Sequence, residues 1–539
     1  MPIIESQVRR DSETFGRRRK AMLALIANIE RLEQQVHRCS ARAKPQFDKR
    51  GQLLPRDRLA LLLDPGASFV ELSTLAGLGQ HDDDGVDEVY GAGIITGIGY
   101  VSGTRCMVYI NDAAIKGGTN MPQAYDKLKR SQEIALRARL PFVCLVQSGG
   151  GNLFKQHLGF NRAGHRFMTQ ARSSAAGLPQ ITVVHGNATA GGAYIPGMSD
   201  YVVMVRGKSR AFLAGPPLLK AATGEIADEE TLGGADMHAT HSGLAEFVAE
   251  DDAHAIHIAR ELVQQLRWND RVPATHGRVV LAPRYPAEDL CGLVPVDYRE
   301  AFDCREIIAR LVDGSDFTEF KTLYDPYTIC GFAEIGGWPV GLIGNNGPID
   351  NHGAEKATQF IQLCCQANKP IIYLQNTTGF IVGKESEAAG MIKNGAKLIQ
   401  AVANATVPQI TIIVGASYGA GNYAMCGRSF EPRFLFAWPN AKLAVMGGEQ
   451  AAMVMEIVED NKQRARGKTL DRDKLAEQSR ELTSLYDEVS SALYCTSRVW
   501  DEGIVDPRRT RDLLVELIDL CVRNERTRLH GNTFGVARM

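Results

Sequence analysis

The apolar residues of this chain fall into short, unbroken runs that end in glycine or other small residues. Residues 139–151, RLPFVCLVQSGGG, and residues 368–380, NKPIIYLQNTTGF, are two such runs. An apolar run of this length that is closed by turn-forming residues is typical of a buried strand followed by a tight turn. We therefore predict a buried strand in each segment and a glycine turn after it.

The two runs belong to an internal repeat. Aligning Pro141 with Pro370 sets the offset between the two copies. At this repeat offset further positions match, namely Leu145 with Leu374, Gly150 with Gly379, Pro179 with Pro408 and Gly192 with Gly421. A short gap then places Gly215 opposite Gly448. A repeat of this length predicts two like domains in tandem, over residues 1–275 and 276–539.

Other segments predict how the two domains are joined and extended. The stretch 271–300 contains several prolines and little periodicity, so we expect the domain boundary there. Residues 17–38 have apolar residues at helical spacing, and residues 459–500 are rich in charge and helical in pattern. We interpret these two stretches as a solvated helix pair or an interface arm.

Composition narrows the class of protein. The chain has 539 residues, of which 44% are hydrophobic, and its formal net charge is −1, which argues against a dedicated nucleic-acid binder. Its 11 cysteines are scattered without a C-x-x-C pair, so we expect neither a zinc site nor disulfides. The N-terminal segment shows no signal or transit peptide and no long apolar run occurs, which predicts a cytoplasmic protein without a membrane span.

Glycine placement is the strongest chemical signal. The segment 185–194, HGNATAGGAY, predicts a strand, a tight turn at Gly191 and Gly192, and a helix. The second copy offers Gly419, Ala420 and Gly421 in the same place. Glycines between a strand and a helix often serve close packing alone. Two copies in register favour two oxyanion sites, in which backbone N–H groups hold a negatively charged oxygen.

Other catalytic patterns are missing from the sequence. It has no H-E-x-x-H metal motif and no G-x-x-x-x-G-K-[ST] phosphate loop. A crotonase-type hydratase or hydrolase remains an alternative. Such an enzyme would need a carboxylate pair or a histidine over the thioester, and neither stands near the two glycine turns in sequence.

Several motifs together resemble a known family. They are KGGTNMP (116–122), SGGGNL (148–153), TAGGAYIPGMSD (189–200), FLAGPPLLKAATGE (212–225), GLIGNNGPID (341–350), QNTTGFIVGK (375–384), SYGAGNYAMCGR (417–428) and FAWPNAKLAVMGGEQAA (436–452). These segments resemble the carboxyltransferase β subunits of biotin-dependent acyl-CoA carboxylases, in the branch that acts on 3-methylcrotonyl-CoA and geranyl-CoA. The resemblance covers nearly the whole chain.

The resemblance implies a fold, partners and a division of labour. The fold would be α/β, with two tandem crotonase-like domains, each a ββα superhelix. The N-terminal domain would serve the acyl-CoA and the C-terminal domain the biotin, and an active site would combine domains of two subunits in a β6 core of an α6β6 assembly. An α partner would supply biotin carboxylase and the biotin carrier. This chain has no A-M-K-M-type biotinyl segment, so it would perform the carboxyl transfer alone, with no metal.

The resemblance also implies roles for individual residues. Gly191 and Gly192 would hold the thioester enolate of the acyl-CoA, and Ala420 and Gly421 would hold the ureido oxygen of biotin. Two further sets would line the pockets: Thr377, Thr378, Gly379 and Phe380 for biotin, and Gly150, Gly151, Asn345 and Asn346 for CoA.

The substrate prediction rests on the segment 162–170, RAGHRFMTQ. Methylcrotonyl-type members have a stretch like HFGRxFxNQ here, and aligning Gly164 with its glycine puts Ala163 in place of the aromatic. Losing a ring from the acyl pocket, which Phe167 would also line, admits a longer chain. We predict geranyl-CoA, carboxylated at its γ carbon. The alternatives are 3-methylcrotonyl-CoA or another acyl-CoA, since Phe160 or Phe167 could refill the pocket.

Overall fold

A computed structural model describes residues 3–80, 90–274, 278–466 and 472–532. The chain divides into two compact units. The N-terminal unit comprises Arg31–Ala274, Ser497–Val499 and Arg523–Met539, and the C-terminal unit comprises Met1–Glu30, Thr275–Thr496 and Trp500–Val522. The division after Ala274 falls inside the proline-containing stretch, of which residues 275–277 lie outside the described part. The segment Met1–Glu30 groups with the C-terminal unit, not with the half that follows it in sequence.

The N-terminal unit is built on one mixed sheet. Its strands are β1 (Phe69–Leu72), β2 (Ile94–Val101), β3 (Thr104–Asn111), β4 (Phe142–Ser148), β5 (Gln180–Thr189), β6 (Tyr201–Val205), β7 (Arg210–Phe212) and β8 (Phe247–Ala249). Their order is β1-β2-β3-β4-β5-β6-β8, with β7 paired to β5. The first three strands are antiparallel and β3 onward is parallel. The strands β3 and β4 are buried throughout, and for β4 this agrees with the apolar run that predicts it.

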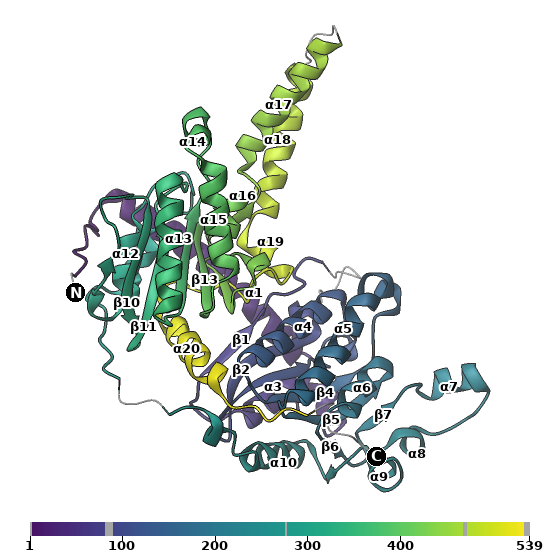
Figure 1. The fold of residues 1–539 in the computed structure, drawn as a ribbon. Helices are drawn as coiled ribbons and strands as arrows, with labels where there is room; N and C mark the ends of the chain where they lie inside the picture. Colours follow the sequence, from purple (N-terminus) through teal and green to yellow (C-terminus); the bar gives the residue numbers. More distant parts are fainter. Residues whose placement is uncertain (1–2, 81–89, 275–277, 467–471, 533–539) are drawn as a thin grey trace. The chain divides into compact units, whose positions relative to one another are not determined.

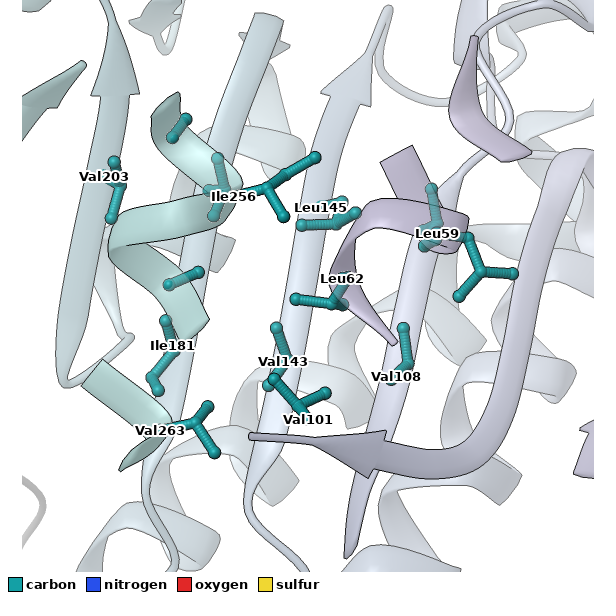
Figure 2. Close-up of a cluster of buried hydrophobic side chains, with 14 of the residues drawn as sticks. Leu59, Leu62, Val101, Val108, Val143, Leu145, Ile181, Val203, Ile256 and Val263 are labelled. Carbon is teal, nitrogen blue, oxygen red and sulfur yellow. The ribbon is translucent and has the colours of Figure 1, made fainter. Parts of the chain in front are cut away.

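Helices α3 (Pro55–Leu62) and α10 (Asp252–Gln265) close one side of this sheet. Figure 2 shows Leu62 of α3 and Ile256 of α10 directed at the strands that carry Leu145 and Ile181. All four side chains are at most 1% exposed. Helices α4 (Pro122–Arg137) and α5 (Gln156–Ala175) lie side by side along the sheet (Figure 1). The buried apolar cluster holds the strand ends in fixed register beneath the glycine turns.

The C-terminal unit repeats this plan. Its strands are β9 (Thr318–Glu319), β10 (Thr328–Ile335), β11 (Trp338–Asn345), β12 (Ile371–Thr377), β13 (Gln409–Tyr418), β14 (Phe434–Ala437) and β15 (Lys442–Ala444). The order is β14-β13-β12-β11-β10-β9, with β15 paired to β13. Helices α13 (Asn351–Gln366) and α15 (Met391–Ala403) cover a cluster that includes Phe360, Tyr373 and Leu398 (Figure 1).

The predicted repeat is confirmed down to its register. Strand β12 matches β4, strand β13 matches β5 and helix α13 matches α4, each at both its first and its last residue, at the offset that places Pro141 on Pro370. Both sheets have a register shift at the same point, between Val146 and Ser148 in one and between Gln375 and Thr377 in the other. Equal spacing without insertions explains why the repeat is visible in the sequence. The fold is therefore α/β with two tandem crotonase-like domains.

The helical extensions are present, with some differences from prediction. The expected helix over 17–38 lies within α1 (Glu13–Ala41). The expected helical stretch from 459 begins earlier, because α17 (Gly448–Ala465) starts directly after β15, and it continues as α18 (Arg472–Val489) and α19 (Ala492–Ser497). Residues 467–471 lie outside the described part. Figure 1 shows α17 and α18 as a helix pair that extends away from the sheet of their unit.

The remaining helices are short, apart from one near the C-terminus. They are α2 (Lys44–Lys49), α6 (Tyr194–Gly197), α7 (Pro216–Thr223), α8 (Glu229–Gly233), α9 (Ala235–Met237), α11 (Leu290–Leu293), α12 (Cys304–Leu311), α14 (Lys384–Ala388), α16 (Gly419–Ala424) and α20 (Thr510–Arg523). Among the described residues, no helix is long and apolar enough to cross a membrane. The same residues contain no group of three His, Cys, Asp or Glu side chains placed to hold a metal ion.

Candidate functional site

The first glycine turn follows β5. Ala190 has a φ of +53°, and residues Ala190–Ala193 form a 3-10 turn that leads into the single helical turn α6. A left-handed conformation costs an alanine roughly 1–2 kcal/mol. The helix after the turn ends at Gly197, and the carbonyl of Ile195 within it accepts hydrogen bonds from the side chains of Gln170 and Ser199. The strained alanine therefore precedes Gly191 and Gly192 in a sharply bent segment.

The second turn has the same conformation. Gly419 has a φ of +57° at the position that matches Ala190, and α16 starts there. Gly192 and Gly421 are both buried, whereas Gly191 is half-buried and Ala420 is exposed. The repeat thus places one bent, partly accessible backbone segment at the end of β5 and one at the end of β13.

Each of these turns packs against the glycine turn of the neighbouring strand. A Cβ added to Gly192 would lie 3.6 Å from the Cβ of Ser148, at the end of β4. A Cβ added to Gly421 would lie 2.9 Å from the Cα of Gly379 and 2.9 Å from Cγ2 of Thr377. The backbone of the second turn therefore approaches its neighbour more closely, which only glycine at position 421 allows.

The glycine turns that follow β4 and β12 also have matching hydrogen bonds at Gly150 and Gly379. The N–H of Gly150 donates to Oγ of Ser148 at 3.2 Å, and the N–H of Gly379 donates to Oγ1 of Thr377 at 3.2 Å. The Gly150 carbonyl accepts from Asn120 at 2.8 Å, and the Gly379 carbonyl accepts from Ile349 at 2.9 Å. Gly151 and Thr378 are exposed, and Phe380 is half-buried against Gly395. The structure thus brings Thr377 and Gly379, two of the residues predicted for biotin, next to Gly421, and it brings Gly150 next to the strand end that packs on Gly192.

The two asparagines predicted for CoA have different surroundings. The side chain of Asn346 is hydrogen-bonded within the fold. Its Oδ1 accepts from the N–H of Cys304 at 2.7 Å and its Nδ2 donates to Asp303 at 3.0 Å. Asn345 is fully buried at the end of β11, and both polar atoms of its amide are without a hydrogen-bond partner. The local contacts of Asn346 are those of a residue that holds the start of α12.

The segment predicted for the acyl pocket lies on α5. Ala163 is half-buried, and Gly164 is exposed with open space where a Cβ would point. Phe167 lies beside the first glycine turn, since its Cζ is 3.6 Å from a Cβ placed on Gly191, and its ring meets Tyr194 edge-on at 5.6 Å. Phe160 is 76% exposed. Phe167 is therefore the aromatic side chain of this segment that packs beside the turn.

Arg166 was not predicted from the sequence as a residue of the site. This residue lies on α5, shortly after Ala163, and it is buried. Its Nη2 donates to the carbonyl of Gly191. The polar stretch around it, NRAGHRFMTQ, gives no apolar stripe from which burial could be predicted. A second missed set is the buried pair of His185 on β5 and Asp252 on α10, which are far apart in the sequence.

Two sheets of like topology, each with a bent glycine turn at the end of the corresponding parallel strand, β5 or β13, define a duplicated crotonase-like protein. A family model described as the carboxyl transferase domain matches residues 46–533. The probable methylcrotonoyl-CoA carboxylase β chain of Drosophila melanogaster is 44% identical, over 100% of this chain and 95% of its own length. The methylcrotonoyl-CoA carboxylase β chain of Dictyostelium discoideum is 46% identical, over 91% of this chain and 83% of its own.

A solved structure is also similar along the full length. The geranyl-CoA carboxylase β subunit of P. aeruginosa is 52% identical, covers 100% of both chains and superposes with a TM-score of 0.94. The chain belongs to the carboxyl transferase domain family, and within it to the β chains of biotin-dependent acyl-CoA carboxylases. The family predicted from the motifs is confirmed.

Proposed function

We propose that this chain transfers the carboxyl group of carboxybiotin to the γ carbon of a β-methyl α,β-unsaturated acyl-CoA, with geranyl-CoA as the preferred substrate. The observation that carries the proposal is the matched pair of bent glycine turns. One turn per half suits a reaction in which two different oxygen atoms gain negative charge, one on the thioester and one on biotin.

The two turns have separate roles in this proposal. The backbone N–H groups at Gly191 and Gly192 stabilise the enolate that forms when the γ carbon loses a proton. Those at Ala420 and Gly421 stabilise the ureido oxygen of biotin. An N–H group aimed at a developing oxyanion contributes a factor of about 10²–10³ to the rate. The reaction needs no acid or base from the side chains, because carboxybiotin supplies both the carboxyl group and, once it has lost CO2, the base.

The residues around the second turn fit such a ligand. Gly379 has a φ of +113° and no side chain, and Ala420 and Thr378 are exposed, so the backbone there is open to a flat ring. In this proposal Thr377, Thr378, Gly379 and Phe380 surround the ring. On the acyl-CoA side, Gly150 and Gly151 face the CoA. Asn345 is buried and the Asn346 side chain is bonded within the fold, so in this proposal their loop serves the CoA site through its backbone.

The substrate assignment has two supports. Ala163 and Gly164 leave the surface of α5 without a bulky side chain over two positions, which suits an acyl group longer than that of 3-methylcrotonyl-CoA. The identity to the geranyl-CoA carboxylase β subunit, at 52%, exceeds the 44% and 46% to the two methylcrotonoyl-CoA carboxylase chains. The competing substrate is 3-methylcrotonyl-CoA.

The first experiment compares the two substrates directly. The chain is reconstituted with its biotin carboxylase and biotin-carrier α subunit, and incorporation of 14C-bicarbonate into geranyl-CoA and 3-methylcrotonyl-CoA is measured. We expect a higher kcat/KM for geranyl-CoA. Activity confined to the shorter thioester would keep the carboxyl transfer and overturn the substrate assignment, and activity on neither would overturn both.

Ala163→Phe tests the pocket itself. A ring at this half-buried position fills volume that a ten-carbon acyl chain needs, so kcat/KM for geranyl-CoA should fall by tenfold or more, at about 1–3 kcal/mol of lost discrimination, while that for 3-methylcrotonyl-CoA changes little. Met168→Phe is the control, because it adds a ring to an exposed position of the same helix. Equal losses on both substrates would contradict the pocket assignment.

The assembly and its location complete the proposal. We propose a cytoplasmic β6 core that binds six α subunits, which carry the biotin. The chain mass of 58.9 kDa makes this core readily distinguishable from a dimer by light scattering on a sizing column. A scattering mass near six chains for the β protein alone, and a further increase on adding the α subunit, would support the assembly. A monomer or dimer that is fully active with its partner would contradict it.

A further inference from the structure

Arg166 is a buried cation for which the fold offers no carboxylate. Its side chain is 5% exposed, and its Nε and Nη1 atoms have no hydrogen-bond partner. Every acidic side chain that the structure describes lies outside ion-pair distance of it. Burying a charge without a partner costs several kcal/mol. A guanidinium in such a place therefore needs an explanation other than stability.

The groups that face this guanidinium are neutral. They are the phenols of Tyr109 and Tyr125 and the thiol of Cys144. Burial raises the pKa of Cys144 to about 12, and burial also raises the pKa values of both tyrosines, so none of the three carries a negative charge at neutral pH. Burial lowers the pKa of Arg166, yet an arginine side chain stays protonated in proteins.

The charge is directed at the first glycine turn. Nη2 of Arg166 donates to the carbonyl of Gly191, and the guanidinium lies over the ring of Phe167 at 4.6 Å. The carbonyl of Gly191 and the N–H of Gly192 belong to one planar peptide and point in opposite directions. The bond from Arg166 therefore fixes the direction of that N–H, and a charged donor on the oxygen polarises the whole peptide.

We propose that Arg166 is a positioning residue that orients and polarises the Gly191–Gly192 peptide for binding the enolate oxygen of the acyl-CoA. This inference rests on the function proposed above and deepens it. The cation never touches substrate. It acts through one backbone peptide, and its positive charge stabilises the negative charge that develops on the other side of that peptide.

Among the described residues, the second turn has no counterpart of Arg166. Gly395 occupies the position that matches Arg166 at the repeat offset, and it has no side chain that could reach the carbonyl of Ala420, which matches that of Gly191. The two turns share a backbone conformation but differ in the residue at this position, which is Arg166 in the first half and Gly395 in the second. This asymmetry suits two different oxyanions.

The test uses Arg166→Met and Arg166→Lys in the complete enzyme with its α subunit. Methionine has a similar length and no charge. The substitution therefore removes the guanidinium, which polarises the peptide and is also a buried charge without an ion-pair partner. We expect kcat for the acyl-CoA to fall by about ten- to a hundredfold, KM to stay within about twofold, and Tm to remain unchanged or to rise. Lysine keeps a positive charge but lacks the planar guanidinium, so the kcat of Arg166→Lys should lie between those of the wild type and of Arg166→Met.

Arg172→Met, an exposed position of the same helix, is the control and should change neither kcat nor Tm. A wild-type kcat in Arg166→Met would overturn the inference, and so would a variant that loses Tm or fails to fold, because that result assigns Arg166 a structural role. Failure of the proposed function would show differently, as a wild-type enzyme that carboxylates neither acyl-CoA.

Discussion

The two buried glycines of the turns differ in the space around them. A methyl group on Gly192 would make ordinary contact with Ser148, whereas one on Gly421 would overlap the backbone of Gly379. The same chemical change therefore has different consequences in the two halves. Side chains can rotate away from a new methyl group, and a neighbouring backbone has no such freedom.

We predict that Gly421→Ala is more harmful than Gly192→Ala. The first should lower Tm by several degrees and carboxylation by tenfold or more, at about 1–3 kcal/mol for an overpacked site. The second should leave Tm within about two degrees. Differential scanning fluorimetry and the 14C assay measure both. Equal Tm shifts would show that the turn at Gly379 yields as easily as the side chain of Ser148.

His185 and Asp252 form a buried acid-sensitive pair. Nδ1 of His185 is 2.8 Å from Asp252, which also accepts two hydrogen bonds from Arg58, at 3.1 and 2.9 Å. All three side chains are at most 2% exposed. Burial and the nearby Arg58 charge lower the pKa of His185 to about 4. Burial disfavours the charge of Asp252, yet the hydrogen bond from His185 and the charges of both partners bring its pKa to about 2.

These pKa values set the acid side of the stability curve. Between about pH 6.5 and pH 4, His185 becomes protonated in the unfolded chain but stays neutral in the folded chain. The free energy of unfolding should therefore fall as the pH is lowered through this window. Asp252 extends the loss from about pH 3.8 toward pH 2. His185→Asn should flatten the dependence of Tm on pH between 4 and 6.5, while His257→Asn, at an exposed position, should not. An unchanged slope in His185→Asn would contradict this assignment.

At the scale of elements, a buried lysine links one helix of each unit to the backbone near the start of a strand, β2 in the first unit and β10 in the second. Lys127 of α4 donates to the carbonyls of Gly91 and Ile94 at 3.2 and 2.7 Å. Lys356 of α13, its counterpart in the repeat, donates to the carbonyl of Asp325 at 2.7 Å. Both side chains are at most 2% exposed. Each ammonium group therefore supplies hydrogen bonds to buried backbone carbonyls.

Removing the ammonium group should therefore loosen the first sheet. We expect Lys127→Met to lower the free energy of unfolding by about 1–3 kcal/mol, because it removes the hydrogen bonds to two carbonyls. Lys129→Met, two residues along the same helix and exposed, is the matched control. Urea titration followed by circular dichroism measures the difference. A Lys127→Met variant as stable as the control would mean that water replaces the ammonium group.

How far the sequence predicts such elements depends on how local their causes are. The strands β4 and β12 and their glycine turns follow from apolar runs and turn residues that stand next to each other in the chain. Lys127 was not predicted as buried, because a lysine on an amphipathic helix is normally exposed. Arg166 and the pair of His185 and Asp252 depend on which helix covers which strand. That information lies in tertiary packing, so single-sequence reasoning does not reach it.

At the scale of the whole molecule, each unit has its own buried apolar cluster. Leu145 lies in the cluster of the N-terminal unit, and its repeat partner Leu374 is fully buried in the C-terminal unit. Units with separate cores unfold as separate cooperative steps unless an interface couples them. We therefore expect two transitions in calorimetry of the β chain.

Matched core substitutions assign these transitions. Leu145→Ala and Leu374→Ala should each cost about 2–5 kcal/mol and each lower a different transition. The two variants serve as controls for each other, since the substitution and the strand position are the same. If either variant lowers both transitions equally, the two units unfold as one.

The constant spacing between the halves also has a consequence for mutational scanning. Every position from Asn120 to Gly192 has a twin in the other half. The backbones of the twins match over α4, β4 and β5, whereas α5 is matched by two helices, α14 and α15, on either side of Gly390. The chain thus provides its own reference experiment. Positions at which both twins accept the same amino acids report what the architecture requires, and positions at which they diverge, such as Arg166 and Gly395, report the separate tasks that the duplicated halves have acquired.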